Sequence, residues 1–206
     1  GAMGTGHGCP ELEVLDIGCH SRPVEACGAA LAPAFRPPHG LPRLKQLLLK
    51  DINLTDLDQL VEALQHRPHA SQPVEVMRLW ECELGDVAVF GQAMAEGGSL
   101  ARLRELTIES GEEAEEWPMQ LVEALAGGAE QQLEKIECRT DQMTIAAVNH
   151  LLQGLAISGA CPRLQSLTFG TLYGDVVQGQ GGPPGQLDAC SLGTILAGRA
   201  GCSATL

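Results

Sequence analysis

The side chains best suited to chemistry in this sequence are its eight cysteines and six histidines. No two cysteines form a Cys-x-x-Cys pair, and no group of Cys and His has the spacing of a zinc site. His66 and His69 are a lone pair beside Pro68, where the sequence predicts a turn. We therefore expect neither a bound metal nor a cofactor.

The motifs of catalysis are also missing from the sequence. It has no His-Glu-x-x-His, no Ser/His/Asp arrangement in a motif context, and no isolated cysteine in a basic setting. The acidic run 109–116 lacks the alternating ligands and glycine turn of a calcium loop, so we interpret it as a solvated loop. The glycine-rich stretch 170–185 matches no phosphate or dinucleotide motif and is predicted to be a flexible insertion. These observations predict a protein that is not an enzyme.

The charge of the chain limits the classes of partner. Thirteen basic and 26 acidic residues give a formal net charge of −13. Nucleic acids and anionic membranes need a positive surface to replace their counterions, so both are disfavoured as partners. The acidity permits a protein partner with a basic surface.

A sequence pattern that repeats at a nearly constant spacing predicts the elements that carry these side chains. The stretch 74–84 reads Val-Glu-Val-Met-Arg-Leu-Trp-Glu-Cys-Glu-Leu, and the step of two from Met77 to Leu79 is a strand alternation. A frame with apolar or cysteine residues at its first, fourth and sixth places recurs from Leu12, Leu44, Val74, Leu103, Leu133 and Leu164. The steps of 32, 30, 29, 30 and 31 residues predict a solenoid.

These frames resemble the leucine-rich repeat family, and the period of about 30 points to its ribonuclease-inhibitor-like subclass. The resemblance implies an α/β horseshoe of about six strand–helix units, with a parallel sheet on the concave face and helices on the convex face. The resemblance covers residues 9 to about 200, and the predicted repeat domain spans residues 9–206. Residues 1–8, which begin Gly-Ala-Met-Gly, are interpreted as a leader left by tag cleavage.

The chain departs from the family at its turns. The family places Asn or Cys eight residues after the first leucine, where only Cys82 fits and Asn53 comes one place late. We therefore expect an irregular solenoid whose turns use backbone or water bonding. No polar capping element precedes Leu12, which predicts either a piece of a larger protein or a degenerate cap.

Several cysteines follow the frame. Cys9 and Cys161 stand three places before a first residue, Cys138 takes the sixth place of its frame, and Cys82 takes the turn position. We expect them to be small buried hydrophobic residues. Thiols scattered in this way favour a reducing, intracellular and cytoplasmic location.

Helices are expected between the strands. The sequence predicts a first helix over Pro23 to Phe35 and a long fifth one over Thr144 to Ile157. In the second unit Thr55 and Asp58 are predicted to begin the helix, with Thr55 as its cap. Four residues there have the spacing of a buried helical stripe, namely Leu57, Leu60, Val61 and Leu64.

Candidate binding residues follow from the strand alternation. The places one after each first residue alternate in charge, as Glu13, Lys45, Glu75, Arg104, Glu134 and Gln165, and neighbours are expected to pair. The places four and six after it carry the residues that we expect to bind a partner, namely Trp80, Arg78, Lys50, Arg139, Glu109 and Glu137. Trp and Arg are enriched at binding hot spots. The alternative is that Trp80 packs on Lys50 or Arg78 as a cation–π pair within the face.

We therefore predict a protein-recognition module that binds a protein on its concave face. Two alternatives stay open. Ran GTPase-activating proteins share this repeat class, so the chain could regulate a partner enzyme. It could instead be an autoinhibitory or structural segment that packs on other domains of its own chain, as in receptors with a nucleotide-binding domain.

Overall fold

The computed structural model of the chain describes residues 9–19, 25–36, 40–67, 73–94, 98–110, 120–121, 124–125, 132–140, 145–158, 161–169 and 203–205. The predicted leader 1–8, the predicted insertion 170–185 and residues 111–116 of the acidic run lie outside the described residues.

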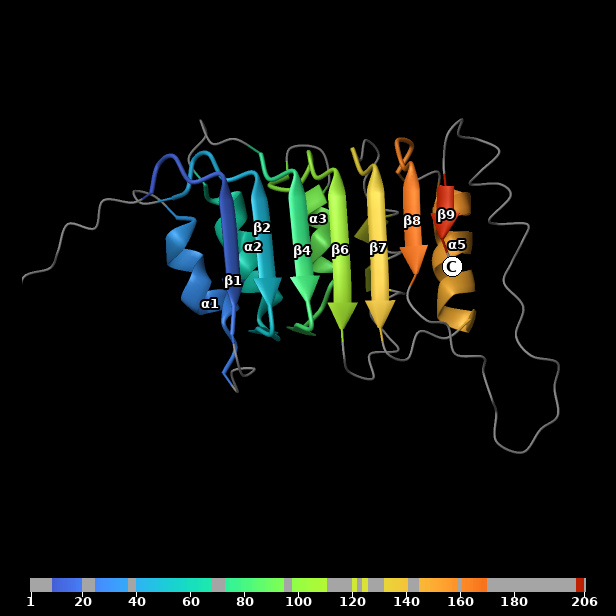
Figure 1. Ribbon diagram of the computed structural model, residues 1–206, viewed down its shortest axis with the longest axis horizontal. Coiled ribbons are helices and arrows are strands. Elements are labelled where there is room, and N and C mark those ends of the chain that lie inside the picture. Colours follow the sequence, from blue (N-terminus) through green and yellow to red (C-terminus); the bar gives the residue numbers. More distant parts are fainter. Residues whose placement is uncertain are drawn as a thin grey trace, which may run out of the picture.

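One parallel sheet of seven strands runs along the molecule (Figure 1). The strands, in their order across the sheet, are β1 (Val14–Gly18), β2 (Gln46–Lys50), β4 (Val76–Trp80), β6 (Glu105–Ser110), β7 (Lys135–Thr140), β8 (Ser166–Phe169) and β9 (Ser203–Thr205). Every neighbouring pair is parallel. The fold is thus α/β with an open sheet, because β1 and β9 lie at its two edges.

Strand pairing joins equivalent places of the six frames. The fourth places lie side by side as Leu15, Leu47, Met77, Leu106, Ile136 and Leu167. The side chains at the fourth and sixth places are buried from β2 to β8 and only partly buried in β1. A shift of the strand pairing by one residue would turn the apolar side chains of a strand to the opposite face of the sheet. Burial of these side chains therefore fixes the register. The predicted positions of the first six strands are confirmed.

A repeated backbone contact begins the five pairings from β1 to β8. The carbonyl oxygen at the second place of a frame accepts two N–H groups from the next frame; for Glu13 the donors are Lys45 and Gln46, at 2.9 and 3.0 Å. Lys45, Glu75, Arg104 and Glu134 accept in the same way. The side chains at this place are therefore aligned in one row across the strands.

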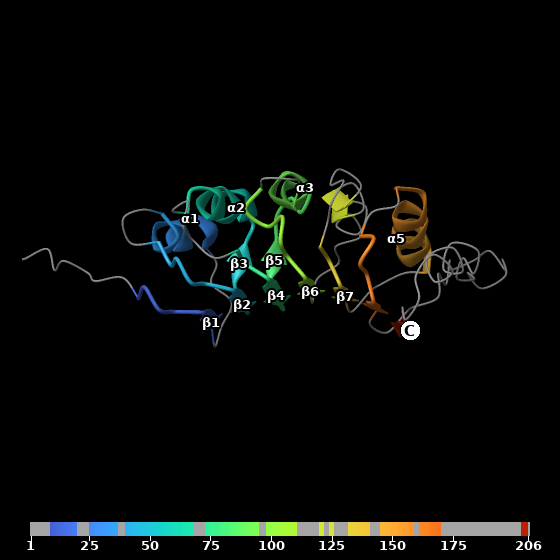
Figure 2. The same cartoon turned by 90° about the horizontal axis from the view of Figure 1, so that it is seen from above.

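The described helices all lie on one side of the sheet (Figure 2). They are α1 (Gly28–Leu31), the 3-10 helix η1 (Ala32–Ala34), α2 (Leu57–Gln65), α3 (Val89–Met94) and α5 (Ile145–Ser158). Between the sheet and the helices, β3 (Asn53–Leu54) and β5 (Glu83–Leu84) form a second, two-stranded sheet. We call the other side of the seven-stranded sheet, which none of the described helices covers, the open face.

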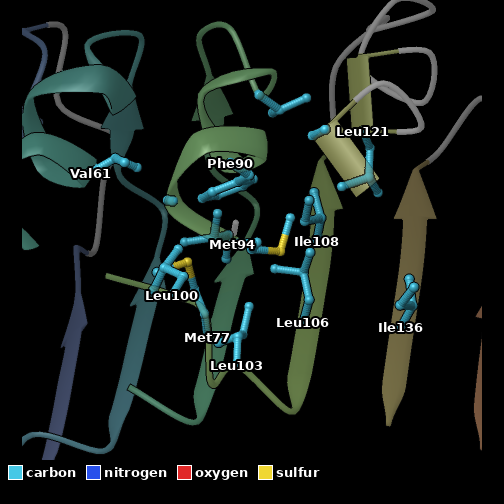
Figure 3. Close-up of a cluster of buried hydrophobic side chains, with 14 of the residues drawn as sticks. Val61, Met77, Phe90, Met94, Leu100, Leu103, Leu106, Ile108, Leu121 and Ile136 are labelled. Atoms are coloured by element: carbon cyan, nitrogen blue, oxygen red, sulfur yellow. The ribbon is translucent and has the colours of Figure 1, made fainter. Parts of the chain in front are cut away.

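An apolar core fills the space between sheet and helices. Phe90 and Met94 of α3 extend toward Met77 of β4 and toward Leu106 and Ile108 of β6 (Figure 3). The predicted stripe of α2 is buried, and so are Val148, Leu151, Leu152 and Leu155 of α5. Each fully buried side chain of this size contributes about 1.5–3 kcal/mol, so the helices are held chiefly by this face.

The first helix is shorter than predicted. The described part of the expected span 23–35, which starts at residue 25, contains a single turn of α-helix, α1, followed by η1 with Pro33 in its first turn. Proline lacks the N–H that would extend α1, and the chain tightens into a 3-10 turn at that point. The predicted α5 is correct to within one residue at each end.

The predicted cap of α2 was wrong. Helix α2 begins at Leu57 with Asp56 as its N-cap, while the Thr55 hydroxyl donates to Asn53 Oδ1 at 2.8 Å. The same oxygen accepts the Thr55 N–H at 3.0 Å, and Asn53 is only 5 % exposed. Asn53 therefore orders the turn with its side chain, where backbone or water bonding had been expected.

The described cysteines differ in burial according to their position in the frames. Cys82, Cys138 and Cys161 are buried, as predicted, and the Cys82 thiol lies 3.5 Å from the Leu49 carbonyl oxygen. Cys9 is exposed, which contradicts the prediction. Cys161 is buried between two frames. Cys9 precedes the edge strand β1, and none of the described residues covers the outer side of Cys9.

The edge strand β9 was not predicted. Ser203, Ala204 and Thr205 pair with Ser166, Leu167 and Thr168 of β8. A small residue, Ala204, stands beside Leu167 where the frame would place a large apolar one. The pattern that revealed the other strands is therefore weak here.

Candidate functional site

The register brings the six predicted binding residues together on the open face. Lys50, Trp80, Glu109 and Arg139 occupy one row, because they are direct partners across β2, β4, β6 and β7. Arg78 and Glu137 stand in the adjacent row with Thr107 between them. Residues far apart in the sequence thus form one surface on four neighbouring strands.

Arg78 is the most constrained of these residues. Its Cζ atom lies 5.8 Å from the centroid of the Trp80 ring, within cation–π range. Its Nη2 atom lies 3.3 Å from Glu105 Oε2. Its Nε atom is buried without a hydrogen-bond partner among the described residues. The guanidinium is therefore held between the ring and a carboxylate.

Trp80 is half-buried at the end of β4. Of the two cations proposed to pack on it, Arg78 makes the ring contact, while Lys50 pairs instead with Glu81 at 3.9 Å. The cation–π alternative is thus present in the structure. It does not bury the ring, so Trp80 keeps a contact surface for a partner.

Glu137 joins two cations. Its carboxylate accepts from Lys135 Nζ at 3.0 Å and also pairs with Arg139, and its side chain is only 14 % exposed. Thr107, on the neighbouring strand, is 3 % exposed. The charged side chains around Thr107 therefore cover the middle of the open face, and the ion pairs of Glu137 hold these side chains in place.

Glu105 and Lys135 were missed by sequence reasoning. Both stand two places after the first residue of their frames, and they pair with Arg78 and Glu137. The signal was available, because residues two apart on a strand share a face. The places two, four and six after each first residue therefore belong to one surface.

In the row at the second place of the frames, the predicted ion pairs form at two steps, Glu13 with Lys45 and Arg104 with Glu134. Lys45 Nζ lies 3.2 Å from Glu13 Oε1, and Arg104 Nη2 lies 2.8 and 3.1 Å from the two carboxylate oxygens of Glu134. These bonds to Glu134 raise the pKa of Arg104 above its ordinary value. Such exposed pairs orient side chains more than they stabilise the fold.

The open face has balanced charge. At the described places two, four and six after each first residue there are four acidic residues and four basic ones, namely Asp16, Glu105, Glu109 and Glu137 against Lys50, Arg78, Lys135 and Arg139. The net charge of −13 therefore resides elsewhere on the chain. It is no guide to the partner of the open face.

Metal sites and membrane-spanning helices are absent from the described part of the chain. Among the described residues, no group of three or more His, Cys, Asp or Glu side chains could hold a metal ion. His66 lies with Nδ1 2.8 Å from the Glu62 carbonyl oxygen after α2, and His69 lies outside the described residues. In the same part of the chain, every helix is too short or too polar to cross a bilayer.

Comparisons with known proteins assign the chain to no family. No family model matches the chain, and no curated protein matches its sequence.

Proposed function

We propose that this protein is a recognition module, built as a solenoid of ribonuclease-inhibitor-like leucine-rich repeats, that binds another protein on its open face. Three repeated features support the solenoid: the in-register frames, the paired backbone bonds at the second place of the first five frames, and the helices on one side of the sheet. In this proposal the open face is the concave face of the horseshoe.

The half-buried Trp80 beside the fixed guanidinium of Arg78 carries the proposal. An aromatic ring and an arginine that are already ordered lose little conformational entropy on binding. Residues of these two types dominate the binding energy of protein interfaces. The other predicted residues, Lys50, Glu109, Glu137 and Arg139, surround this pair on adjacent strands.

The proposed module has no catalytic role and takes no cofactor. The six described cysteines are free thiols, which supports an intracellular, cytoplasmic setting for it.

The test is capture of partners from a cell lysate by the protein and by a double variant, Trp80→Ala with Arg78→Glu. Arg36→Glu is the matched control, because it makes the same change at an arginine that pairs with Glu62 of α2 on the helix side. All three proteins must be fully folded at the temperature of the capture. We expect a protein retained by the parent and the control to be lost by the double variant. Retention by the double variant would refute the open face as the binding site.

The captured protein also separates the remaining alternatives. If it is a GTPase, stimulation of its GTP hydrolysis would favour the regulatory class. If nothing is captured and the chain self-associates, packing on other domains of its own chain becomes the better account.

A further inference from the structure

Strand β1 is an edge of the sheet, and its outward backbone groups face no other strand of the described chain (Figure 1). In the five pairings from β1 to β8, the N–H groups at the second and third places of a frame donate to the frame before it. In the first frame the groups at these places belong to Glu13 and Val14. The matching acceptor is the Gly18 carbonyl oxygen, because Lys50 and Trp80 at the same place accept from the frame before them at 3.1 and 3.0 Å. The edge of β1 therefore offers two donors at its start and one acceptor at its end.

The apolar core is also open at this edge. Leu15 and Ile17 are only partly buried. The residues at the same places of the next frame, Leu47 and Leu49, are fully buried. Val14 is 44 % exposed, and it is the one exposed large apolar side chain among the described residues. Edge strands with free backbone groups and apolar side chains are templates for pairing with another chain.

The charged residues of the stretch 9–19 are three acids. Two of them already have partners in the next frame, because Glu11 pairs with Arg43 and Glu13 pairs with Lys45. These two carboxylates are therefore no guide to a neighbour on the outer side of β1.

The third acid, Asp16, is exposed and forms no ion pair with the described residues. Its direct neighbour on β2 is the apolar Leu48. The cation at its diagonal, Lys50, pairs with Glu81 instead. A basic side chain on the outer side of β1 would therefore give Asp16 an ion-pair partner.

We propose that the edge of β1 binds an extended segment of another protein, which adds a parallel strand to the sheet. The apolar side chains of that segment cover Leu15 and Ile17, and a lysine or arginine on its other face pairs with Asp16. The parallel direction follows from the backbone groups, because the same groups in the next five frames are satisfied by a parallel strand. This surface lies two strands from Trp80 and Arg78 of β4, so the inference goes beyond the proposed function.

Segments of this chain fit the edge less well than a strand from another protein. Two β1 strands side by side would bring the acids of both copies together, and like charges across a strand pair are destabilising. Strand β9 of a second copy offers the small Ala204 where a large apolar residue is needed to cover Leu15. Residues 1–8 contain only Ala2 and Met3 as apolar residues, so they supply no alternating apolar face.

The probe is a peptide of about eight residues, the usual length of a strand, in which valine alternates with threonine and one central threonine is replaced by lysine. Its ends are blocked and it carries a fluorescent label, so that anisotropy measures its affinity for the whole chain. We expect saturable binding, and binding weaker by about tenfold when the lysine is changed to glutamate.

Amide hydrogen exchange locates the contact. At saturation, exchange at Glu13 and Val14 should slow by about tenfold or more, because their N–H groups gain acceptors. The Gln46 amide, which already donates to the Glu13 carbonyl oxygen, should be unchanged. Protection of Glu13 and Val14 in the free protein would show that this chain covers its own edge, and would overturn the inference.

N-methylation of the peptide tests the direction of the strand without any change to the protein. The Cys19 N–H donates to the next strand, and the alternation along β1 gives Leu15 and Ile17 the same direction. A parallel segment would therefore bond β1 through the amides of its valines. Methyl groups on the valine amides should abolish binding, and methyl groups on the other amides should change the affinity by less than about twofold. The reverse result would show an antiparallel strand and would overturn the inference.

Two protein variants test the ion pair. Asp16→Asn removes the carboxylate and should weaken binding of the lysine peptide about two- to fivefold. Asp58→Asn makes the same change at an exposed residue of α2, on the helix side of the sheet, and should leave the affinity unchanged. Both variants must be fully folded at the temperature of the titration. Equal affinities in the two variants, or no binding of the lysine peptide, would overturn this inference and would leave the test of the open face unaffected.

Discussion

The guanidinium of Arg78 lies over the ring of Trp80, with Cζ 5.8 Å from the ring centroid, while its Nη2 atom reaches Glu105 on the next strand. One side chain thus orders two neighbours, one on its own strand and one on β6. Three side chains of the open face are therefore coupled before any partner binds.

This coupling predicts non-additive stability. In a double-mutant cycle, Arg78→Ala and Trp80→Ala should show an interaction free energy of about 0.5–1 kcal/mol, because the pair is partly shielded from water. The measurement is urea unfolding of the parent, the two single variants and the double variant. Strict additivity would show that the ring and the guanidinium are neighbours without attraction.

Asp56 should stabilise the first helix from outside its own unit. Its two carboxylate oxygens accept the N–H groups of Gly28 and Ala29 at 2.7 and 2.8 Å, at the start of α1. Asp56→Ala is expected to lower the free energy of unfolding by about 1–2 kcal/mol and to speed amide exchange at those two residues. Asp58→Ala, which removes an exposed acid from the first turn of α2, is the control; an equal loss there would contradict the contact.

The approach of Asp56 also forbids a side chain at Gly28. A Cβ atom there would lie 2.3 Å from the Asp56 carbonyl oxygen and 2.7 Å from Oδ1. Gly28→Ala should therefore cost about 1–3 kcal/mol despite the better helix propensity of alanine. Gly18→Ala, where the nearest atom would be 3.7 Å away, should change stability by less than about 0.5 kcal/mol. Thermal unfolding of both variants decides the matter, and similar melting temperatures would refute the close approach.

Cys138 should make the protein less stable in alkali. Burial, and secondarily the charge of Glu137, raises the pKa of its thiol from 9.0 to about 12. Below the ordinary value the thiol is protonated in both states. Between the two values the unfolded chain releases the proton and the native protein keeps it, so stability falls as pH rises.

The measurement is urea unfolding of the parent and of Cys138→Val. From about pH 8 to about pH 10 the parent should lose about 1 kcal/mol more than the variant. Cys9→Val, at an exposed thiol, should behave as the parent does. A pH dependence that is unchanged in Cys138→Val would show that other groups cause it.

The strands of the fold could be predicted from the sequence because their signal is local and repeated. Leu47, Met77 and Leu106 occupy the same place in three successive frames, and burial leaves them one register. The helices were harder to delimit. Pro33 ends α1 through the N–H that it lacks. Asp56, which makes no side-chain bond to its own helix, stands at the cap position that Thr55 was expected to fill, and the Thr55 hydroxyl is bonded to Asn53.

The sequence could predict which residues form the candidate surface. It could not predict which of them interact with one another. The spacing placed Trp80, Arg78 and Lys50 on one face. It did not reveal which cation packs on the ring, because that depends on the competing carboxylates Glu81 and Glu105. These partners come from the turn and from a neighbouring strand.

The paired backbone bonds at the second place of the first five frames use carbonyl and N–H groups alone. Neighbouring strands are therefore aligned there without help from the side chains that point out of the open face. The backbone positions of the open face therefore keep a constant spacing when the side chains that they carry are changed. An engineer could vary Glu105, Lys135 or Arg139 to retarget the protein, as long as the inward places beside them keep their apolar residues.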